Sequence, residues 1–416
     1  MIRSILFVLF LFGIGIHLHG QNVVQNQNLG FSLADGKKKV RIPIEVFNNL
    51  VVVPVVLNDA LPLKFILDTG VRTTILTQKT FTDILNLPYS RKYTISGPGG
   101  VKLVDAYVTN NVSIDLPGVN GRGHAMLVLE EDYLELRNYL GTDVHGILGY
   151  ELFSRFIIEI DYEKKILTLM MPEKFHKGRR FQAIPIMIED TKPYMIAPVT
   201  LENGSTLNAK MLMDSGASHG LMLEPSSDTV IKVPEHTVSS LIGRGLGGEI
   251  FGKVGRIKSL SLGTYTLDRV ICNFPDPNSY NDSIKVGNVF RNGAIGGEVL
   301  SRFTVIFNFP RERVYLKKNS AFKKNFYYNL SGLTLKAKGS QLNIFEVTEV
   351  RDQSASQRGG ILAGDIIVSV NGIATRDLNL NMINGFFNSK PGKKIRVEIL
   401  RKGARMKKEM QLRDQI

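Results

Sequence analysis

Two aspartates stand in the same short motif, 146 residues apart. Asp68 begins Asp-Thr-Gly and Asp214 begins Asp-Ser-Gly, and an apolar run precedes each. Two carboxyl groups held a few ångströms apart cannot both ionise freely, because like charges share one proton. Such a pair contains a general base and a general acid at once, and it titrates as a pair. The two motifs therefore predict a pair of carboxyl groups that can act as acid and base in the same reaction, provided that the fold brings them together.

The sequence around the two motifs repeats as well. Gly97 and Gly243 each lie 29 residues after their aspartate, inside glycine-rich stretches. Gly149 and Gly296 lie 81 and 82 residues after their aspartates, and each closes a triplet of two apolar residues and a glycine. A repeat of this length indicates one structural unit that is used twice.

The repeated unit reads as β-structure. Residues 30–318 contain short β-branched and apolar runs interrupted by Gly, Pro and Asn, which is typical of strands and tight turns. Each half ends in a predicted hairpin, over residues 157–169 and 304–316. Two similar all-β lobes that each supply one aspartate predict a pseudo-two-fold site at their interface.

Together these features resemble the aspartic protease superfamily, and more closely its retropepsin-like branch. The resemblance rests on the two Asp-Ser/Thr-Gly motifs and on the triplets ending in Gly149 and Gly296, and it covers roughly 290 of the 416 residues. It implies a mainly β fold of two pseudo-symmetric β-barrel lobes and catalysis by Asp68 and Asp214. It also implies polypeptide substrates and no cofactor or metal. One chain supplies both aspartates, so a monomer suffices for the active site.

The resemblance assigns supporting roles to the neighbours of the aspartates. The hydroxyl groups of Thr69 and Ser215 would reach the backbone of the opposite lobe. Gly70 and Gly216 would let the backbone pass close beneath the site. The two apolar triplets would support the catalytic loops from behind. The alternative for each single motif is an ordinary turn after a strand, because all three residue types favour turns.

Two glycine-rich stretches, residues 96–100 and 243–248, stand where each lobe would carry a flap hairpin. Mobile hairpins that close over an extended substrate exclude water and add strand pairing. The alternative is an ordinary glycine hairpin loop, and neither stretch has the spacing of a phosphate-binding loop. The candidate flap residues are Gly97, Gly99, Gly100, Gly245 and Gly247.

The first motif departs from the family pattern. Val71 and Arg72 follow it, where the family more often has small residues. A cationic Arg72 would either lower the pKa of a carboxyl group or point away from the site. The alternative function is therefore a non-catalytic peptide-binding protein on an inactive aspartic-protease scaffold.

A different pattern begins near residue 322. Residues 359–372 contain a Gly-Asp turn and a strand that ends in Asn-Gly, and this segment resembles a PDZ domain of the bacterial type. The resemblance implies a small α+β domain that binds a peptide or a protein C-terminus beside an edge strand. The alternative is a small β-rich cap on the lobes. The residues expected at the peptide groove are Leu330, Ser331, Gly332 and Leu333.

The chain therefore divides into four expected segments. Residues 1–20 contain one positive charge, an apolar run and a small residue before Gln21, which predicts a cleaved signal peptide and an exported protein, periplasmic or secreted. The alternative is an uncleaved anchor. Residues 21–175 and 176–320 are the expected protease lobes, and residues 321–416 are the expected PDZ-like domain.

Composition adds limits on partners. The net charge is +14, and residues 311–416 hold 21 Lys and Arg against 9 Asp and Glu, so most of the charge arises there. This favours acidic peptides or an anionic surface, whereas no motif supports nucleic-acid binding. Cys272 is the single cysteine and excludes an intramolecular disulfide, and the seven histidines show no metal-ligand spacing.

Overall fold

The computed structural model describes residues 29–95, 97–99, 103–277 and 289–416. The predicted signal peptide, residues 1–20, lies outside these residues. Strands form 48% of the chain and helices 13%, which confirms the mainly β fold class. In the part of the chain that is described, no helix is long and apolar enough to cross a membrane.

The first half of the repeat builds a nine-stranded sheet in the order β3-β4-β5-β12-β6-β11-β8-β7, with β9 beside β4. Its strands are β3 (Glu45–Phe47), β4 (Leu50–Leu57), β5 (Leu61–Leu67), β6 (Ile75–Leu76), β7 (Tyr89–Ile95), β8 (Val104–Val112), β9 (Ile114–Asp115), β11 (His124–Leu129) and β12 (Gly146–Leu148). Strands β1 (Gly30–Leu33) and β10 (Val119–Arg122) form a separate pair. The helices here are α1 (Thr80–Ile84), α2 (Leu136–Leu140) and α3 (Tyr150–Arg155).

The second half builds a ten-stranded sheet in the order β20-β21-β24-β19-β25-β18-β17-β22-β23, with β16 beside β17. Its strands are β16 (Met187–Glu189), β17 (Lys192–Thr200), β18 (Thr206–Met213), β19 (Leu221–Leu223), β20 (Val238–Gly245), β21 (Gly248–Arg256), β22 (Ser259–Leu262), β23 (Tyr265–Asp268), β24 (Ile271–Pro275) and β25 (Gly293–Ile295), and helix α4 (Gly297–Leu300) follows.

Equivalent two-residue turns open the sheets of both halves. Asn48 and Asn49 join β3 to β4 with φ of 46° and 66°, and Asp190 and Thr191 join β16 to β17 with φ of 45° and 70°. Positive φ at both central residues is typical of the turn whose twist matches a hairpin, and Asn and Asp tolerate it. Both turns reach the interface between the halves.

The two halves share a six-stranded sheet in the order β15-β27-β26-β13-β14-β2. The first half supplies β2 (Lys39–Pro43), β13 (Ile157–Asp161) and β14 (Ile166–Met170), and the second supplies β15 (Gln182–Pro185), β26 (Phe303–Asn308) and β27 (Arg313–Lys318). The central pair is β13 with β26, in which Ile158 lies opposite Phe307. Phe153 packs edge-on against Phe307, and buried aromatic contacts of this kind hold the halves together.

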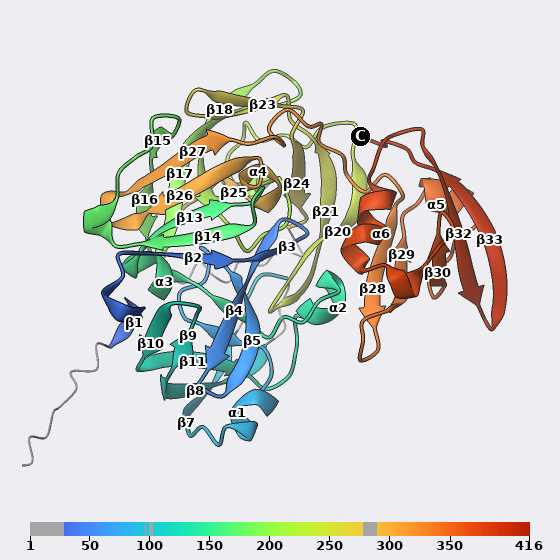
Figure 1. Ribbon diagram of the computed structural model, residues 1–416. Helices are drawn as coiled ribbons and strands as arrows, with labels where there is room; N and C mark the ends of the chain where they lie inside the picture. The colour runs from blue at the N-terminus through green and yellow to red at the C-terminus, as the bar shows by residue number, and fades with distance from the viewer. Residues whose placement is uncertain (1–28, 96, 100–102, 278–288) are drawn as a thin grey trace, which may run out of the picture.

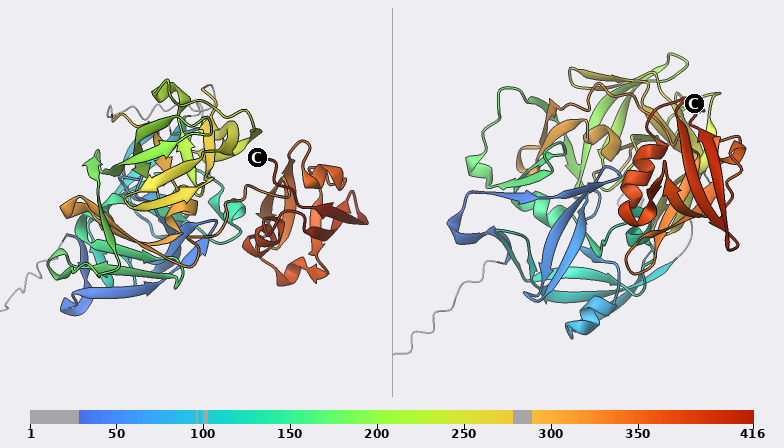
Figure 2. Two further views of the ribbon diagram at one scale, coloured as in Figure 1. Left: turned by 90° about the horizontal axis from the view of Figure 1, so that it is seen from above. Right: turned by 45° about the vertical axis from the view of Figure 1, so that its right-hand side comes forward.

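The C-terminal part forms a separate five-strand path, β28-β29-β30-β32-β33, with β31 beside β30 and its own hydrophobic core. Figures 1 and 2 show it as a distinct body beside the two lobes. Its elements are β28 (Leu333–Lys338), β29 (Ile344–Val350), α5 (Ala355–Arg358), β30 (Ile366–Val370), β31 (Ile373–Ala374), α6 (Leu380–Phe387), β32 (Lys394–Arg401) and β33 (Ala404–Gln411).

A buried arginine of the second lobe holds this C-terminal part. Arg256 is 6% exposed and donates hydrogen bonds to the backbone oxygens of Phe326 and Ile416, at 3.1 and 3.0 Å. It also pairs with Asp414 at 2.9 Å. One guanidinium therefore ties both the entering and the leaving segment of the C-terminal part to the lobe.

Candidate active site

The two aspartates meet at the base of one cavity. Asp68 follows β5 and Asp214 follows β18, and both line a cavity of about 1200 Å³. The backbone N–H of Asp68 donates to the Leu148 oxygen, and that of Asp214 donates to the Ile295 oxygen, each at 2.9 Å. Strands β12 and β25, which run parallel to β5 and β18, therefore fix the start of both aspartate loops.

Four hydrogen bonds lock the two loops to each other. The backbone N–H of Thr69 donates to Ser215 Oγ, and that of Ser215 donates to Thr69 Oγ1, both at 3.0 Å. Each hydroxyl group then donates to a carbonyl oxygen of the other lobe, Thr69 to Met213 at 2.6 Å and Ser215 to Leu67 at 2.9 Å. Both side chains are buried, so the lock is shielded from competing water.

Gly70 and Gly216 allow the close approach of the loops. A Cβ atom on Gly216 would lie 2.2 Å from Asp68 Cγ, which no side chain can occupy. The N–H of Gly70 donates to Asp68 Oδ1 at 2.6 Å, and that of Gly216 donates to Asp214 Oδ1 at 2.9 Å. Both carboxyl groups are therefore oriented by their own loops.

Gly149 and Gly296 lie behind the loops, where their backbone passes close to them. A Cβ atom would lie 2.0 Å from the Val71 oxygen at Gly149 and 2.2 Å from the His219 oxygen at Gly296. In both lobes, the glycine that ends the repeated apolar triplet therefore contacts the segment that follows the aspartate.

The surroundings favour a protonated carboxyl group. Burial, and after it the charge of Asp214, raise the pKa of Asp68 to about 8. Burial also raises the pKa of Asp214. The Gly70 amide and the positive charge of Lys192 oppose the shift at Asp68 but do not cancel it. The pair is therefore expected to hold one proton at neutral pH.

Any acid–base catalysis by this pair should persist through neutral pH. The general acid must carry a proton, and the raised pKa of Asp68 keeps one on the pair until the pH rises through about 8. The raised pKa of Asp214 places the acid limb above the ordinary value of 3.8. The measurement that checks this is kcat/KM for casein cleavage between pH 3 and pH 10. An optimum near pH 3 with no activity at pH 7 would contradict the expectation.

Arg72 points to the opposite lobe. Its guanidinium lies 3.7 Å from Asp190 of the β16–β17 turn, and its side chain is 72% exposed. The repeat-related contact joins Asn49 of the β3–β4 turn to the backbone oxygen of Ser218, at 3.2 Å. The fourth residue after each aspartate therefore contacts the turn of the other lobe.

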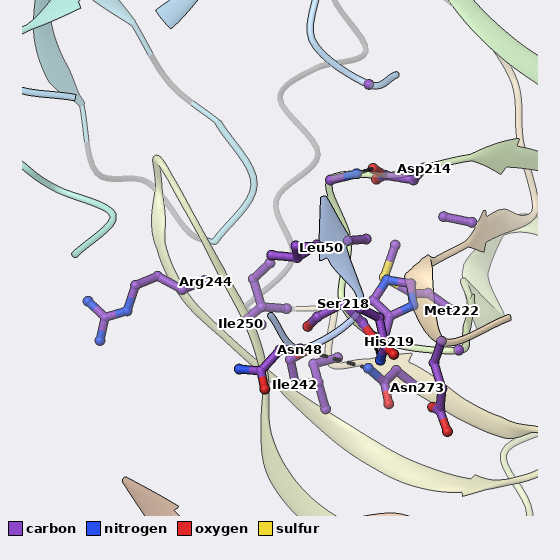
Figure 3. Close-up of a pocket in the computed structure, with 18 of the residues that line it drawn as sticks. Asn48, Leu50, Asp214, Ser218, His219, Met222, Ile242, Arg244, Ile250 and Asn273 are labelled. Carbon is purple, nitrogen blue, oxygen red and sulfur yellow. Dashed lines mark hydrogen bonds between the residues drawn. The ribbon is translucent and has the colours of Figure 1, made fainter. Parts of the chain in front are cut away.

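The segment after Asp214 matches the G-x-S-x-G motif of serine hydrolases in its residue spacing. Residues 216–220 read Gly-Ala-Ser-His-Gly, but strand β19 follows, not the helix that a nucleophile elbow requires. His219 lines the cavity, where burial lowers its pKa to about 4. Figure 3 shows Ser218 and His219 beside Met222, with Arg244 pointing away from this group. The neutral imidazole is thus part of the cavity wall.

The two predicted flaps touch at their tips. A Cβ on Gly97 would lie 2.8 Å from Leu246 Cβ, one on Gly99 2.0 Å from the Gly248 oxygen, and one on Gly245 2.1 Å from the Pro98 oxygen. The N–H of Gly247 donates to the same Pro98 oxygen at 2.9 Å. Gly97 and Gly245 also line the cavity. Gly100 lies outside the described residues.

Family comparison adds two assignments to this geometry. Residues 53–152 match the model of an aspartyl protease family, and residues 331–412 match that of a PDZ domain. The chain contains an aspartyl protease domain and a PDZ domain. The first match includes Asp68 and ends before Asp214, so the second lobe rests on the repeat and the fold. No curated protein matches the chain.

Among the described residues, no three His, Cys, Asp or Glu side chains form a group that could hold a metal ion.

Helix α2 of the first lobe packs against the edge strand β28 of the PDZ domain. Asn138 donates through its side chain to the Ala337 oxygen at 2.7 Å. Glu135, just before α2, lies 2.5 Å from the Lys336 ammonium and 3.6 Å from the guanidinium of Arg244 in the β20–β21 hairpin. One carboxylate therefore joins the first lobe, this hairpin of the second lobe and the PDZ domain. The sequence analysis did not identify it.

Replacing Glu135 by Gln should weaken the attachment of both β28 and the β20–β21 hairpin to the first lobe. We expect roughly fivefold faster amide exchange in β28 and in the β20–β21 hairpin, since partly exposed pairs contribute up to about 1 kcal/mol. Hydrogen exchange measured by mass spectrometry checks this. Glu131→Gln, on the same loop and exposed, is the matched control. Equal exchange in both variants would show that Glu135 does not restrain these segments.

At the expected peptide groove of the PDZ domain, the backbone N–H groups of the loop before β28 already bind acceptors within that loop. The N–H of Gly332 donates to Asn329 at 3.0 Å, and that of Leu333 donates to Ser331 Oγ at 3.1 Å. Leu330, Ser331 and Leu333 are buried. A bound carboxylate would therefore have to replace internal hydrogen bonds. Ser331 and Leu333 nevertheless line the same cavity as the aspartates.

Proposed function

We propose that the chain is an aspartic endopeptidase and that Asp68 and Asp214 are its catalytic residues. The observation that carries the proposal is the pair itself: two carboxyl groups of raised pKa at the base of one cavity, in loops joined by four hydrogen bonds. An arrangement that holds one proton between two carboxyl groups is the requirement of this chemistry.

The ionised carboxyl group takes a proton from a water molecule held between the pair. The water oxygen attacks the peptide carbonyl carbon, and the protonated carboxyl group donates to the carbonyl oxygen. The tetrahedral intermediate then collapses, with proton transfer to the leaving nitrogen. No covalent enzyme intermediate forms, and the pair ends with one proton, as it began.

The substrate is an extended polypeptide that crosses the cavity beneath the two flap hairpins. Apolar side chains line much of its path, so the substrate side chains there are expected to be apolar. These lining residues include Leu50, Ile147, Met222 and Leu246. Because both aspartates belong to one chain, a monomer is sufficient.

We further propose that the PDZ domain binds a peptide or a protein C-terminus along β28 and that the protein is exported after cleavage at residue 20. For the first proposal, β28 is an edge strand whose second side faces α6 and α2 rather than another strand. The second rests on the composition of residues 1–20.

A non-catalytic peptide-binding role is the alternative, and one experiment separates the two. The protein comprising residues 21–416 is incubated with casein between pH 3 and 8, with and without a statine-type transition-state mimic. The expected result is cleavage that the mimic abolishes, because tight binding of such a mimic needs a working pair. Folded protein that neither cleaves nor binds the mimic would favour the binding role.

A further inference from the structure

Cross-strand pairing shows which residues of the two lobes occupy the same place. Val52 and Tyr194 each lie opposite the residue that stands two positions before the aspartate of their own lobe. Two positions earlier on the same strands, and therefore on the same face, lie Leu50 and Lys192. Each is also the first residue after the equivalent two-residue turn. The two lobes thus present a leucine and a lysine at one equivalent position of the cleft.

The side chains of Leu50 and Lys192 have different surroundings. Leu50 is buried in an apolar cluster with Val52 and Ile66. Lys192 is half-buried and lines the cavity. Within the described residues, its ammonium group has no hydrogen-bond or ion-pair partner, although it is close enough for its charge to act on both aspartates.

The three arginines on the cavity wall are already paired, and the other lysine there, Lys324, is exposed. Arg291 lies 3.2 Å from Glu224, and Arg302 lies 4.0 Å from Glu298. Arg244 lies 2.5 Å from Glu249, outside the group around the aspartates. The Lys192 ammonium group is half-buried, has three donors and has no partner among the described residues, so an incoming carboxylate would complete this site beside the paired arginines.

We propose that Lys192 determines specificity by binding a carboxylate of the substrate next to the scissile bond, on the second-lobe side of the cleft. The carboxylate is that of an Asp or Glu side chain or of a free C-terminus. The proposal rests on the proposed function, because it assigns a subsite of the same cleft. The equivalent subsite on the first-lobe side, lined by Leu50, takes an apolar side chain.

The competing explanation is that Lys192 serves the aspartate pair alone. In that case its removal changes cleavage of all substrates alike and shifts the pH profile. A specificity role instead changes the ratio between a substrate that carries the carboxylate and a twin that lacks it. The ratio is therefore the quantity to measure.

Cleavage sites in casein are mapped first, and ten-residue peptides are made around one of them. A single Glu is moved through the positions flanking the scissile bond, and each peptide has a Gln twin. A second pair carries a C-terminal acid or a C-terminal amide. At one position we expect wild type to prefer the carboxylate by at least about tenfold in kcat/KM, as a charge-assisted hydrogen bond provides.

The Lys192→Leu variant, which copies the residue of the first lobe, should reduce this ratio to about one, whereas Lys192→Arg should keep most of it. Lys258→Leu, an exposed lysine of the same lobe outside the cavity wall, should leave it unchanged. A ratio near one in wild type, or an unchanged ratio in Lys192→Leu, would overturn the proposal.

Peptide binding separates this inference from the proposed function. Fluorescence anisotropy measures the affinity of dye-labelled Glu and Gln peptides for wild type and for Lys192→Leu, with no need for turnover. If wild type cleaves nothing but binds the Glu peptides more tightly through Lys192, the protease assignment fails and the subsite stands. If peptides are cleaved or bound without regard to the carboxylate, or are not bound at all, the subsite is wrong.

Discussion

Replacing Asp214 by Asn should lower kcat by at least about a thousandfold without unfolding the protein. The amide cannot act as base or acid, and general acid–base catalysis by such groups contributes about two to four orders of magnitude. Asn retains an oxygen that can accept the hydrogen bond from the Gly216 N–H, which is 2.9 Å long in wild type. Asp68→Asn should have the same effect, because the two carboxyl groups act as a unit. The measurement is casein cleavage at pH 6.

Thermal unfolding supplies the control for both variants. A carboxyl group whose pKa is higher in the folded protein than in the unfolded chain binds its proton more tightly when folded, so it destabilises the fold as pH rises toward the folded pKa. For Asp68 that destabilisation grows from about pH 4 and is complete above about 8. Asp68→Asn should therefore unfold at no lower temperature than wild type at pH 8.5. Activity retained in either folded variant would refute the catalytic pair.

The candidate site was predictable because its chemistry is carried by short motifs. Asp68, Thr69 and Gly70 are adjacent in the chain, and a strand followed by a sharp turn fixes their relation locally. The repeat then implied that the second motif faces the first, since similar lobes pack about a pseudo-two-fold axis. The equivalence of Leu50 and Lys192 was not predictable from the sequence, because the spacing to the aspartates differs between the lobes and only the cross-strand register fixes the alignment.

The shared six-stranded sheet was not predicted. The hairpins over residues 157–169 and 304–316 were expected separately, but pairing of β13 with β26 joins segments almost 150 residues apart, and no local pattern encodes it. One signal was present. Strand β26 has four apolar residues among six, as strands covered on both faces often have, whereas β13 carries Glu159 and Asp161 among its five residues.

The contact of Glu135 with the PDZ domain was also beyond sequence reasoning. Helix α2 has five residues, too few for a periodic pattern, and Glu135 enters it with a left-handed φ of 49° and no side-chain cap. The internal hydrogen bonds of the loop before β28 were likewise missed, because the sequence shows which amides could bind a carboxylate but not which are already occupied.

The lock between the aspartate loops should be the most sensitive structural feature of the site. Ser215→Ala removes the hydroxyl group that donates to the Leu67 oxygen and accepts from the Thr69 N–H. Both backbone groups would be left buried without a partner, at roughly 1–3 kcal/mol each. We expect the free energy of unfolding to fall by roughly 2–6 kcal/mol in total and cleavage to fall with it, because the two carboxyl groups lose their fixed separation.

Thr69→Ser is the matched control, because it keeps the hydroxyl group that donates to the Met213 oxygen and loses only a methyl group. It should retain nearly all activity and lose little stability, whereas Thr69→Val should behave like Ser215→Ala. Urea unfolding monitored by circular dichroism gives the stabilities, and casein cleavage gives the rates. If Ser215→Ala is as stable and as active as Thr69→Ser, the four hydrogen bonds do not hold the pair, and the six-stranded sheet alone must set the separation of the carboxyl groups.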